Sequence, residues 1–320
     1  MNPLTGLYGA ATALRNTLFD RGVLSSRRLE RPVVSVGNLS LGGSGKTPFV
    51  IALGELLKAR GIHFDVLSRG YGRKTRGVLI VETDGNAADF GDEPLLIARR
   101  LGVPVVVGES RYEAGRVAEL KFQPQLHILD DGFQHRSLVR DFDIVLMTER
   151  DFDDRLLPSG RLREPLSSLR RADAIVLPAS LAVDHPAVRQ KLIWRIEREL
   201  VLPSLPSAPV VFCGIARPEQ FFAQVRAAGI TPAAEIIFRD HHAYDRSDIA
   251  RLLAMRGNLG AGGFLTTEKD AVNLGSLQLD LKPFAVAALS LTLNHPTDAV
   301  DAVLARTISE RIISPRIISR

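Results

Sequence analysis

The feature that most constrains this chain is the octapeptide SLGGSGKT at residues 40–47. The segment before it, RPVVSVGNLS, is a short β-branched run that predicts a buried strand. The segment after it, PFVIALGELLKARG, has helical periodicity and ends in a glycine. A strand, a glycine-rich loop and a helix in this order are the setting of a phosphate-binding loop, or P-loop, whose usual pattern is G-x-x-x-x-G-K-[ST].

The octapeptide fits this pattern at Gly45, Lys46 and Thr47, whereas Ser40 stands in place of the first glycine. The remaining glycines can still supply the dihedrals of a tight turn, so that N–H groups of the loop and helix point at phosphate oxygens. Lys46 would then reach the β- and γ-phosphates, and the Thr47 hydroxyl would bind Mg²⁺. The predicted nucleotide-binding residues are Ser40, Leu41, Gly42, Gly43, Ser44, Gly45, Lys46 and Thr47.

Strands and helices alternate along the rest of the chain, which predicts an α/β fold. We expect a P-loop NTPase-like parallel sheet flanked by helices, followed by a second, smaller α/β domain. The proline-rich LPSLPSAP at residues 202–209 is interpreted as the linker between them. The expected organisation is an N-terminal amphipathic segment at 1–31, a P-loop kinase domain at 32–205, a smaller domain at 206–305 and a basic tail at 306–320.

The positive charge of the chain lies at its two ends. Residues 1–31 hold five arginines against two carboxylates, and residues 306–320 hold four arginines against one, which leaves the long central part near neutrality. A nucleic-acid binder carries its basic surface on a folded domain, so this distribution favours an anionic membrane surface instead. The only cysteine, Cys213, excludes an internal disulfide and fits a reducing compartment.

The first helix expected, at residues 3–19, has a stripe of apolar side chains. A stripe of this kind fits either a helix that packs into the core or one that lies on a membrane surface. No stretch approaches about 18 uninterrupted apolar residues, so no transmembrane helix is expected. The residues at helical spacing are Leu4, Leu7, Tyr8, Ala11, Leu14 and Leu18.

Carboxylates mark two further places of interest. The segment LHILDDGFQH is an apolar strand that ends in Asp130 and Asp131, as a Walker-B element does, and one of the two would hold Mg²⁺. The alternative is an ordinary strand followed by an Asp-Gly turn. Asp92 in GDEP begins a predicted helix, where a carboxylate by itself indicates a cap.

The absence of two kinds of motif narrows the choice of nucleotide and metal cofactor. Guanine recognition would need a motif such as N-K-x-D, and the nearest match, TEKD at 267–270, has the wrong spacing, so ATP is the expected nucleotide. The sequence contains no cluster of histidines and cysteines with metal-ligand spacing, which argues against zinc.

Seven motifs together resemble the tetraacyldisaccharide 4′-kinase family of lipid A biosynthesis, over residues 32 to about 272. In order, they are VGNLSLGGSGKTP, SRGYGR, GDEP, DDGFQH, LPSGRLREP, DHHAY and TEKDAV. The family's own loop also lacks the first P-loop glycine. The resemblance implies transfer of the ATP γ-phosphate to the 4′-hydroxyl of a tetraacylated glucosamine disaccharide 1-phosphate, giving lipid IVA.

The resemblance also implies roles for particular residues. Asp92 matches the family's catalytic base, supported by His241, which is preferred over His242 because it directly follows Asp240. Asp130, Asp131 and Thr47 match the metal region. The remaining matches are active-site polar residues expected to bind substrate, namely Arg111, His135, Arg163 and Glu164.

The family resemblance implies a peripheral, monotopic enzyme on the cytoplasmic face of a Gram-negative inner membrane. It implies neither nucleic acid nor an obligate protein partner. One alternative is a P-loop kinase or ligase that acts on a soluble small molecule. Another is a nucleotide-dependent switch or metallochaperone, although such proteins usually carry a guanine motif or Cys/His metal ligands.

Overall fold

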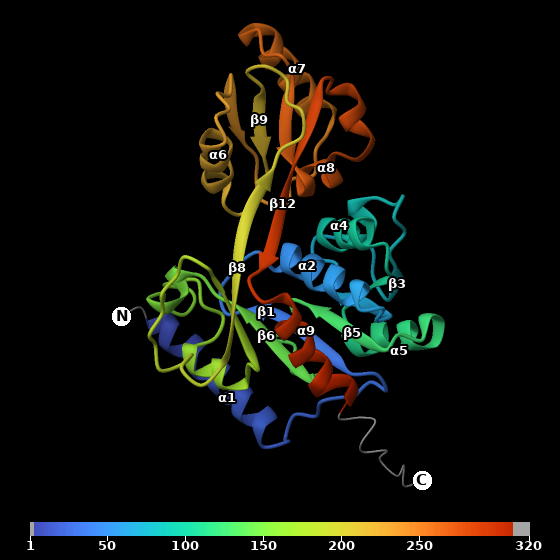
Figure 1. The fold of residues 1–320 in the computed structure, drawn as a ribbon, viewed down its shortest axis with the longest axis vertical. Helices are drawn as coiled ribbons and strands as arrows, with labels where there is room; N and C mark the ends of the chain where they lie inside the picture. The colour runs from blue at the N-terminus through green and yellow to red at the C-terminus, as the bar shows by residue number, and fades with distance from the viewer. Residues whose placement is uncertain (1–2, 310–320) are drawn as a thin grey trace.

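The computed structural model describes residues 3–309, and its centre is one long, mostly parallel sheet (Figure 1). The described residues form twelve strands in the order β10-β9-β11-β12-β8-β7-β6-β1-β5-β2-β4-β3. The strands are β1 (Val33–Asn38), β2 (Phe64–Ser68), β3 (Leu79–Ile80), β4 (Val105–Val107), β5 (Leu126–Asp130), β6 (Phe142–Leu146), β7 (Ala174–Pro178), β8 (Leu192–Val201), β9 (Val210–Cys213), β10 (Ala234–Ile237), β11 (Phe264–Thr267) and β12 (Phe284–Leu293). The predicted α/β fold with helices flanking a large parallel sheet is confirmed.

The helices alternate with these strands as the sequence predicted. They are α1 (Pro3–Asp20), α2 (Lys46–Ala59), α3 (Ala87–Phe90), α4 (Asp92–Leu101), α5 (Arg111–Phe122), α6 (Pro218–Ala227), α7 (Arg246–Leu259), α8 (Glu268–Leu274) and α9 (Pro296–Leu304). The run RGVLIVET forms only the short edge strand β3, which pairs antiparallel with β4.

The register of the central strands determines where the two phosphate-site motifs meet. Strand β1 lies between β5 and β6 and is parallel to both. Val36 of β1 is level with Asp130 of β5, so the P-loop and the acidic pair leave the sheet side by side. Strand order reverses around β1, and the carboxyl ends of strands at such a switch point are where α/β sheets bind ligands.

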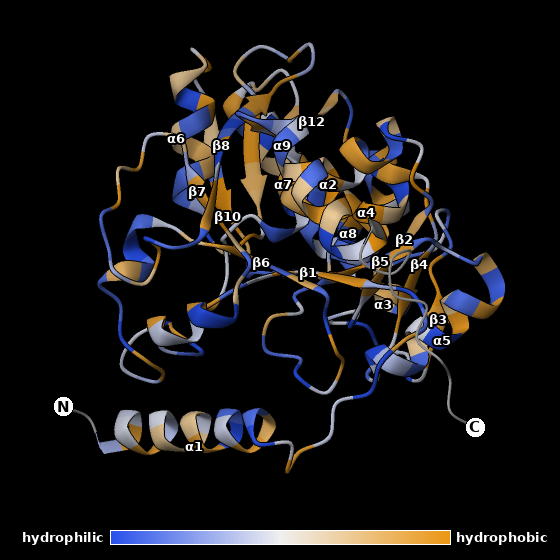
Figure 2. Ribbon diagram, turned by 60° about the horizontal axis from the view of Figure 1, so that its bottom comes forward, coloured by the Kyte–Doolittle hydropathy of each residue, from blue (hydrophilic) through white to orange (hydrophobic). Residues whose placement is uncertain are grey.

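Apolar side chains hold the helices against both faces of the large sheet. On one face, α2 buries Phe49, Leu53 and Leu57 in a core that it shares with α4 and α9. On the other face, α5 packs its small residues Ala114 and Ala118 against the strands. Hydrophilic and hydrophobic residues alternate along the ribbons of these helices (Figure 2). Burial of these apolar stripes accounts for the layered arrangement.

A two-stranded ribbon joins the large sheet to the smaller group of strands. The first part of β12 pairs in parallel with β11, and residues 288–293 pair antiparallel with residues 196–201 of β8. Figure 1 shows β8 and β12 running side by side between the two groups. The stretch LPSLPSAP, interpreted as a linker, forms the connection between β8 and β9. Strand β8 itself was not predicted, although Trp194 and Ile196 alternate with polar residues and are buried as strand residues.

The chain returns to the large sheet after this ribbon. Helix α9 buries Ala299, Val300 and Val303 in the same core as α2. The predicted smaller domain, residues 206–305, therefore includes α9, although α9 packs with the P-loop unit. The basic tail predicted at 306–320 falls mainly on residues 310–320, which lie outside the described residues.

Helix α1 attaches to the rest of the molecule through polar contacts. Leu4, Leu7 and Leu14 are 58%, 68% and 61% exposed, and the only buried residue of the helix is Asn16. The helix prediction is confirmed, and the core-packing interpretation is wrong because the apolar stripe faces outward. Within residues 3–309 no helix is both long and apolar enough to cross a membrane.

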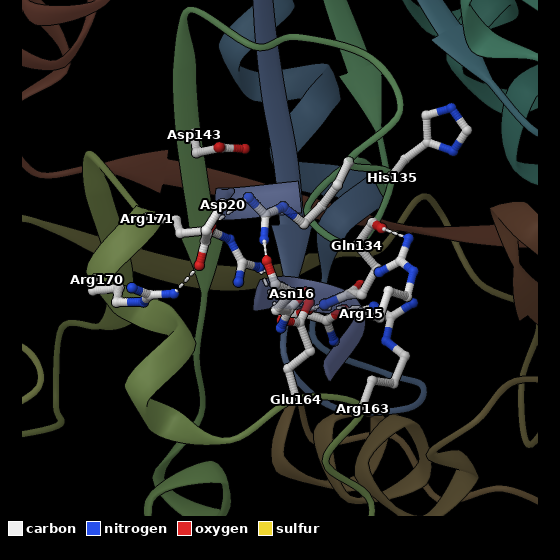
Figure 3. A network of polar contacts seen from close by, with 12 residues as sticks. Arg15, Asn16, Asp20, Gln134, His135, Asp143, Arg163, Glu164, Arg170 and Arg171 are labelled. Atoms are coloured by element: carbon white, nitrogen blue, oxygen red, sulfur yellow. Dashed lines mark hydrogen bonds and ion pairs between the residues drawn. The ribbon is translucent and has the colours of Figure 1, made fainter. Parts of the chain in front are cut away.

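The polar face of α1 reaches segments that also carry predicted site residues (Figure 3). Asn16 donates a 2.7 Å hydrogen bond to Glu164, and the Tyr8 hydroxyl donates to the carbonyl of Arg163. Arg15 donates to the carbonyl of Gln134, and Asp20 accepts from Arg136 and Arg170. Polar docking of this kind leaves the side chains of Leu4, Leu7 and Leu14 more than half exposed.

Candidate active site

The P-loop follows β1 and turns through three glycines in the left-handed region. Gly42, Gly43 and Gly45 have φ values of 69°, 52° and 86°. Ser40 has no positive φ; it is buried and forms an isolated bridge with Leu162, so its position does not require glycine. The loop thus turns without the first glycine of the usual pattern.

Lys46 begins α2 and lies directly beside the acidic pair. Its Nζ is 3.1 Å from the side-chain oxygen of Asn38 and 3.5 Å from Asp131 Oδ1. Thr47 follows it and is almost buried. The ammonium and the helix N-terminus together make a cationic corner suited to phosphate oxygens.

The two carboxylates after β5 have opposite electrostatic surroundings. Burial, together with the nearby Glu93 and Asp131 carboxylates, raises the pKa of Asp130 to about 7. Desolvation acts in the same sense on Asp131, but Lys46 and a bidentate ion pair with Arg163 outweigh it and hold the pKa of Asp131 well below its usual range. Asp131 has a φ of 49°, a strained value for a non-glycine residue and one often found at functional sites.

Other predicted substrate-binding residues surround this pair unequally. Arg111 begins α5, and burial and the neighbouring Arg69 lower its pKa to about 10 while both aspartates pull it upward. Burial and the nearby Arg111 and Arg140 lower the pKa of His135 to about 4, so its ring is neutral near pH 7. Arg111 thus lies in the electrostatic field of the acidic pair, and His135 lies in the field of Arg111 and Arg140.

Glu164 is placed differently from the other predicted substrate-binding residues. Its side chain is buried, accepts from Asn16 of α1 and forms a 3.0 Å ion pair with Arg171. These partners use its carboxylate to hold α1. The structure therefore brings Arg163 to the acidic pair and Glu164, its neighbour in sequence, to the helix docking site.

Asp92 and His241 meet although 149 positions separate them in the sequence. His241 Nδ1 is 2.8 Å from Asp92 Oδ2 and 3.1 Å from Oδ1. Burial opposes ionisation of Asp92, but hydrogen bonding to His241 and the charge of Lys269 lower its pKa. Burial likewise opposes protonation of His241, but Asp92 raises the pKa of the imidazole.

The turn before α4 presents Asp92 to its partner. Gly91 has a φ of 91° and a ψ of 149°, which only glycine adopts readily, and a Cβ there would lie 2.9 Å from the Tyr71 carbonyl oxygen. Asp92 Oδ1 also accepts from the N–H of Glu93. Asp92 is thus the first residue of α4 and not its N-cap, which is Gly91, and its contact with the Glu93 N–H is compatible with the contact to His241.

Several residues of the site escaped the sequence analysis. Asn38 links Lys46 and Arg163 through its side chain, and it stands within the quoted motif VGNLSLGGSGKTP. Lys269 and Asn273 of α8 both reach Asp92, and Lys269 lies within the family motif TEKDAV, although no role was predicted for it. For Asn38 and Lys269, the available signal in the sequence was their position within a quoted motif.

Three further arginines lie around the P-loop, and of these only Arg161 belongs to a quoted motif, LPSGRLREP. Arg161 donates to the Leu41 carbonyl and Arg198 of β8 donates to the Ser44 carbonyl. The Arg217 side chain packs over the loop, where a Cβ on Gly43 would lie 2.8 Å from its Nε. They come from three distant segments, so only the fold brings them together.

These features define a class of protein. A P-loop beside an acidic strand end, with a buried carboxylate–histidine pair nearby, is the arrangement of a P-loop phosphotransferase. Comparison with known proteins identifies the family: a family model described as tetraacyldisaccharide-1-P 4′-kinase matches residues 1–309. The chain belongs to this family.

Individual relatives agree with this assignment. A tetraacyldisaccharide 4′-kinase of Koribacter versatilis is 50% identical over 314 residues, covering 95% of this chain and 98% of that protein. A protein of the same name from Aquifex aeolicus is 41% identical over 289 residues, covering 85% and 88%. Among solved structures, the apo form of LpxK from Aquifex aeolicus in complex with ATP superposes with a TM-score of 0.78 at 34% identity, covering 95% and 98%.

Proposed function

We propose that the chain is a kinase that transfers the γ-phosphate of ATP to the 4′-hydroxyl of a tetraacylated glucosamine disaccharide 1-phosphate, the precursor of lipid IVA. The contact between Asp92 and His241 carries the assignment of the catalytic base, because it is a buried acid–base pair at the predicted positions. The family membership carries the choice of substrate and replaces the alternative of a soluble small-molecule kinase.

The chemistry needs a base for the acceptor and positive charge for the phosphates. The acceptor oxygen attacks the γ-phosphorus as the bond to the β–γ bridging oxygen breaks, and ADP leaves with that electron pair. The alcohol proton passes to Asp92, whose lowered pKa keeps it ionised and ready to accept. Lys46 and Arg163 face the transferred group and stabilise its charge.

We infer that Mg²⁺ is the metal cofactor and that Thr47 and the acidic pair hold it. The donors fit: Asp130 Oδ1 is buried without a hydrogen-bond partner, and hard oxygen ligands suit Mg²⁺. When bound, Mg²⁺ would neutralise charge on the β- and γ-phosphates. Among residues 3–309 no group of three or more His, Cys, Asp and Glu residues forms a metal cage, so phosphate oxygens would complete the ligand set.

We infer further that α1 holds the enzyme on the cytoplasmic face of the inner membrane. The outward leucines would enter the interface, and the arginines of residues 1–31 would meet anionic lipid heads. The acyl chains of the substrate lie in that bilayer. Docking there brings the sugar head to the edge of the protein from which α1 contacts the Arg163 segment.

The test of the base assignment compares Asp92→Asn, His241→Gln and the double variant. Initial rates are measured with radiolabelled ATP, Mg²⁺ and detergent-dispersed disaccharide lipid. Loss of a general base lowers kcat by about 10²–10⁴-fold, so we expect this range for Asp92→Asn and a smaller loss for His241→Gln. Because the two side chains act as one unit, the double variant should lose little more than Asp92→Asn.

Two results would count against this assignment. Losses that multiply in the double variant would mean that the two residues act separately. A lower Tm for Asp92→Asn with an unchanged kcat would leave Asp92 only the helix-terminal role seen in its contact with the Glu93 N–H.

A further inference from the structure

Lys269 of α8 faces the Asp92–His241 pair and contacts both of its side chains. Its Nζ lies 3.2 Å from His241 Nε2 and 3.8 Å from Asp92 Oδ2. It also lies 3.4 Å from carboxylate oxygens of Glu93 and Asp240. The side chain is only 16% exposed. Such a position is unlike that of a solvated surface lysine.

The lysine is an ammonium in this position. Burial would lower its pKa, but the carboxylates of Glu93, Asp92 and Asp240 outweigh that effect and raise the pKa of Lys269. An ammonium group has three donors and no acceptor. It can therefore meet a ring nitrogen at hydrogen-bonding distance only if that nitrogen offers its lone pair.

This requirement determines the tautomer of His241. With Nε2 accepting from Lys269, the ring proton must be on Nδ1, where it is donated to Asp92. The ring is then neutral and is held at both nitrogens. The Tyr71 ring, 5.0 Å from the imidazole between centroids, packs against it as well. His241 has a φ of 58°, so the backbone is also held in an unusual conformation.

We propose that Lys269 is a positioning residue that keeps His241 as the neutral Nδ1–H tautomer and so keeps Asp92 available as a base. The proposal rests on the proposed function, in which Asp92 accepts the acceptor proton. The charged groups facing the imidazole are Asp92 from α4, Asp240 from the preceding loop and Lys269 from α8. Glu93 of α4 contacts the Lys269 ammonium instead. Of these, only Lys269 disfavours a second proton on the ring.

The consequence of removing Lys269 has a definite sign. Without the ammonium, the carboxylates of Asp92 and Asp240 would favour the imidazolium, and His241 would keep two protons up to a higher pH. An imidazolium paired with Asp92 stabilises the carboxylate and weakens it as a base. The acidic limb of the kcat profile should therefore move to higher pH.

The experiment compares Lys269→Met and Lys269→Arg in the full-length enzyme. Removing a like charge at this range shifts a pKa by about one unit or more, so Lys269→Met should move the acidic limb upward by that amount. Lys269→Arg keeps the charge and should keep the limb in place, even if kcat falls. Lys269→Gln replaces Lys269→Met if the methionine variant does not fold.

The matched control is Lys58→Met. Lys58 is an exposed lysine of α2 whose ammonium donates a 2.6 Å hydrogen bond to the Leu101 carbonyl at the far end of α4. Its loss loosens the same helix without touching His241. An acidic limb that moves equally in Lys58→Met and Lys269→Met, or in neither, would overturn the proposal.

A measurement independent of catalysis separates this proposal from the function on which it rests. The ¹⁵N spectrum of the histidine rings, with His241 assigned through His241→Gln, reports the tautomer directly. We expect Nδ1–H in the wild type and a raised His241 pKa in Lys269→Met. If the tautomer of His241 depends on Lys269 while Asp92→Asn remains active, the base assignment fails and the positioning role of Lys269 stands. If the tautomer is the same with and without Lys269, the positioning role is refuted.

Discussion

At the scale of single residues, charge placement around the P-loop decides what this site can do. Lys46, Arg163 and Asp131 form a chain of ion pairs at the carboxyl edge of β1 and β5. In this chain the cations keep Asp131 ionised, whereas Asp130, without a cation in contact, has a pKa raised to about 7 by burial and by its acidic neighbours. A phosphate group and its metal would meet both kinds of charge within one corner.

Replacing Lys46 with alanine should nearly abolish phosphoryl transfer. Loss of a contact that stabilises developing charge costs roughly 10²-fold or more. Asp131 would keep its ion pair with Arg163, so the fold should survive. The check is the initial rate with radiolabelled ATP, with Tm as the measure of folding. Lys121→Ala, at an exposed lysine of α5, is the control; a folded Lys46→Ala enzyme with more than about a tenth of the wild-type rate is incompatible with the assignment.

A second residue-scale prediction concerns His127, which is fully buried between Asp65 at 2.8 Å and Glu119 at 3.5 Å. Burial opposes its protonation, but the two carboxylates raise its pKa to about 9, against an ordinary value of 6.5. The stabilisation of the folded state by protonated His127 is therefore complete below pH 6.5 and is lost as pH rises through about 9.

Urea unfolding at a series of pH values tests this prediction. The free energy of unfolding of the wild type should fall between pH 6.5 and about 9, and His127→Gln should flatten that fall. The difference between the two proteins isolates His127 from other groups that titrate in the same range. Parallel curves for both would show that the imidazole carries no such linkage.

At the scale of elements, α1 has two faces with different roles. Its polar face anchors it through Asn16 and Asp20, and its apolar face presents the leucines. Replacing Leu4, Leu7 and Leu14 with serine should therefore leave Tm and nucleotide affinity unchanged and weaken vesicle binding. A leucine at the interface contributes roughly half of the 1.5–3 kcal/mol of a fully buried one, so the triple change should lower vesicle affinity by on the order of 10²-fold.

The measurement is co-sedimentation with anionic vesicles at low and high salt, because the arginine contribution is screened by salt. Leu120→Ser together with Leu279→Ser serves as the control, since both leucines are exposed but lie outside α1. If this control lost as much vesicle binding as the α1 variant, the docking role would belong to the surface in general.

At the scale of the whole molecule, packing decides whether α9 belongs to the P-loop unit or to the smaller unit. Val300 of α9 is buried in the core of α2, whereas Leu252 of α7 is buried in the core of the smaller unit. Placing an aspartate in either core costs several kcal/mol. Val300→Asp should therefore raise amide hydrogen exchange in α2, and Leu252→Asp should raise it around β9 and β11. The reverse pattern, or a uniform rise in both variants, would mean that α9 does not belong to the P-loop unit.

Local sequence determined much of this protein. The P-loop, the acidic end of β5, the alternation of strands and helices and the existence of α1 all follow from short-range patterns, since periodicity and turn chemistry act over a few residues. Strand β8 was missed because flanking prolines suggested a linker, although Trp194 and Ile196 already alternated with charged residues. The alternation of apolar and charged residues indicated a strand, but the flanking prolines indicated a linker more strongly.

Tertiary structure decided what no local pattern contains. Asp92 looks like a helix cap until His241, 149 positions away, comes to within 2.8 Å of it. The stripe of α1 points outward only because Asn16 and Asp20 find partners on the protein, and Glu164 serves that docking while its neighbour Arg163 serves the acidic pair. Contacts of this kind depend on sheet order and on the pairing of distant segments, and their energies are set by burial, which a sequence alone does not specify.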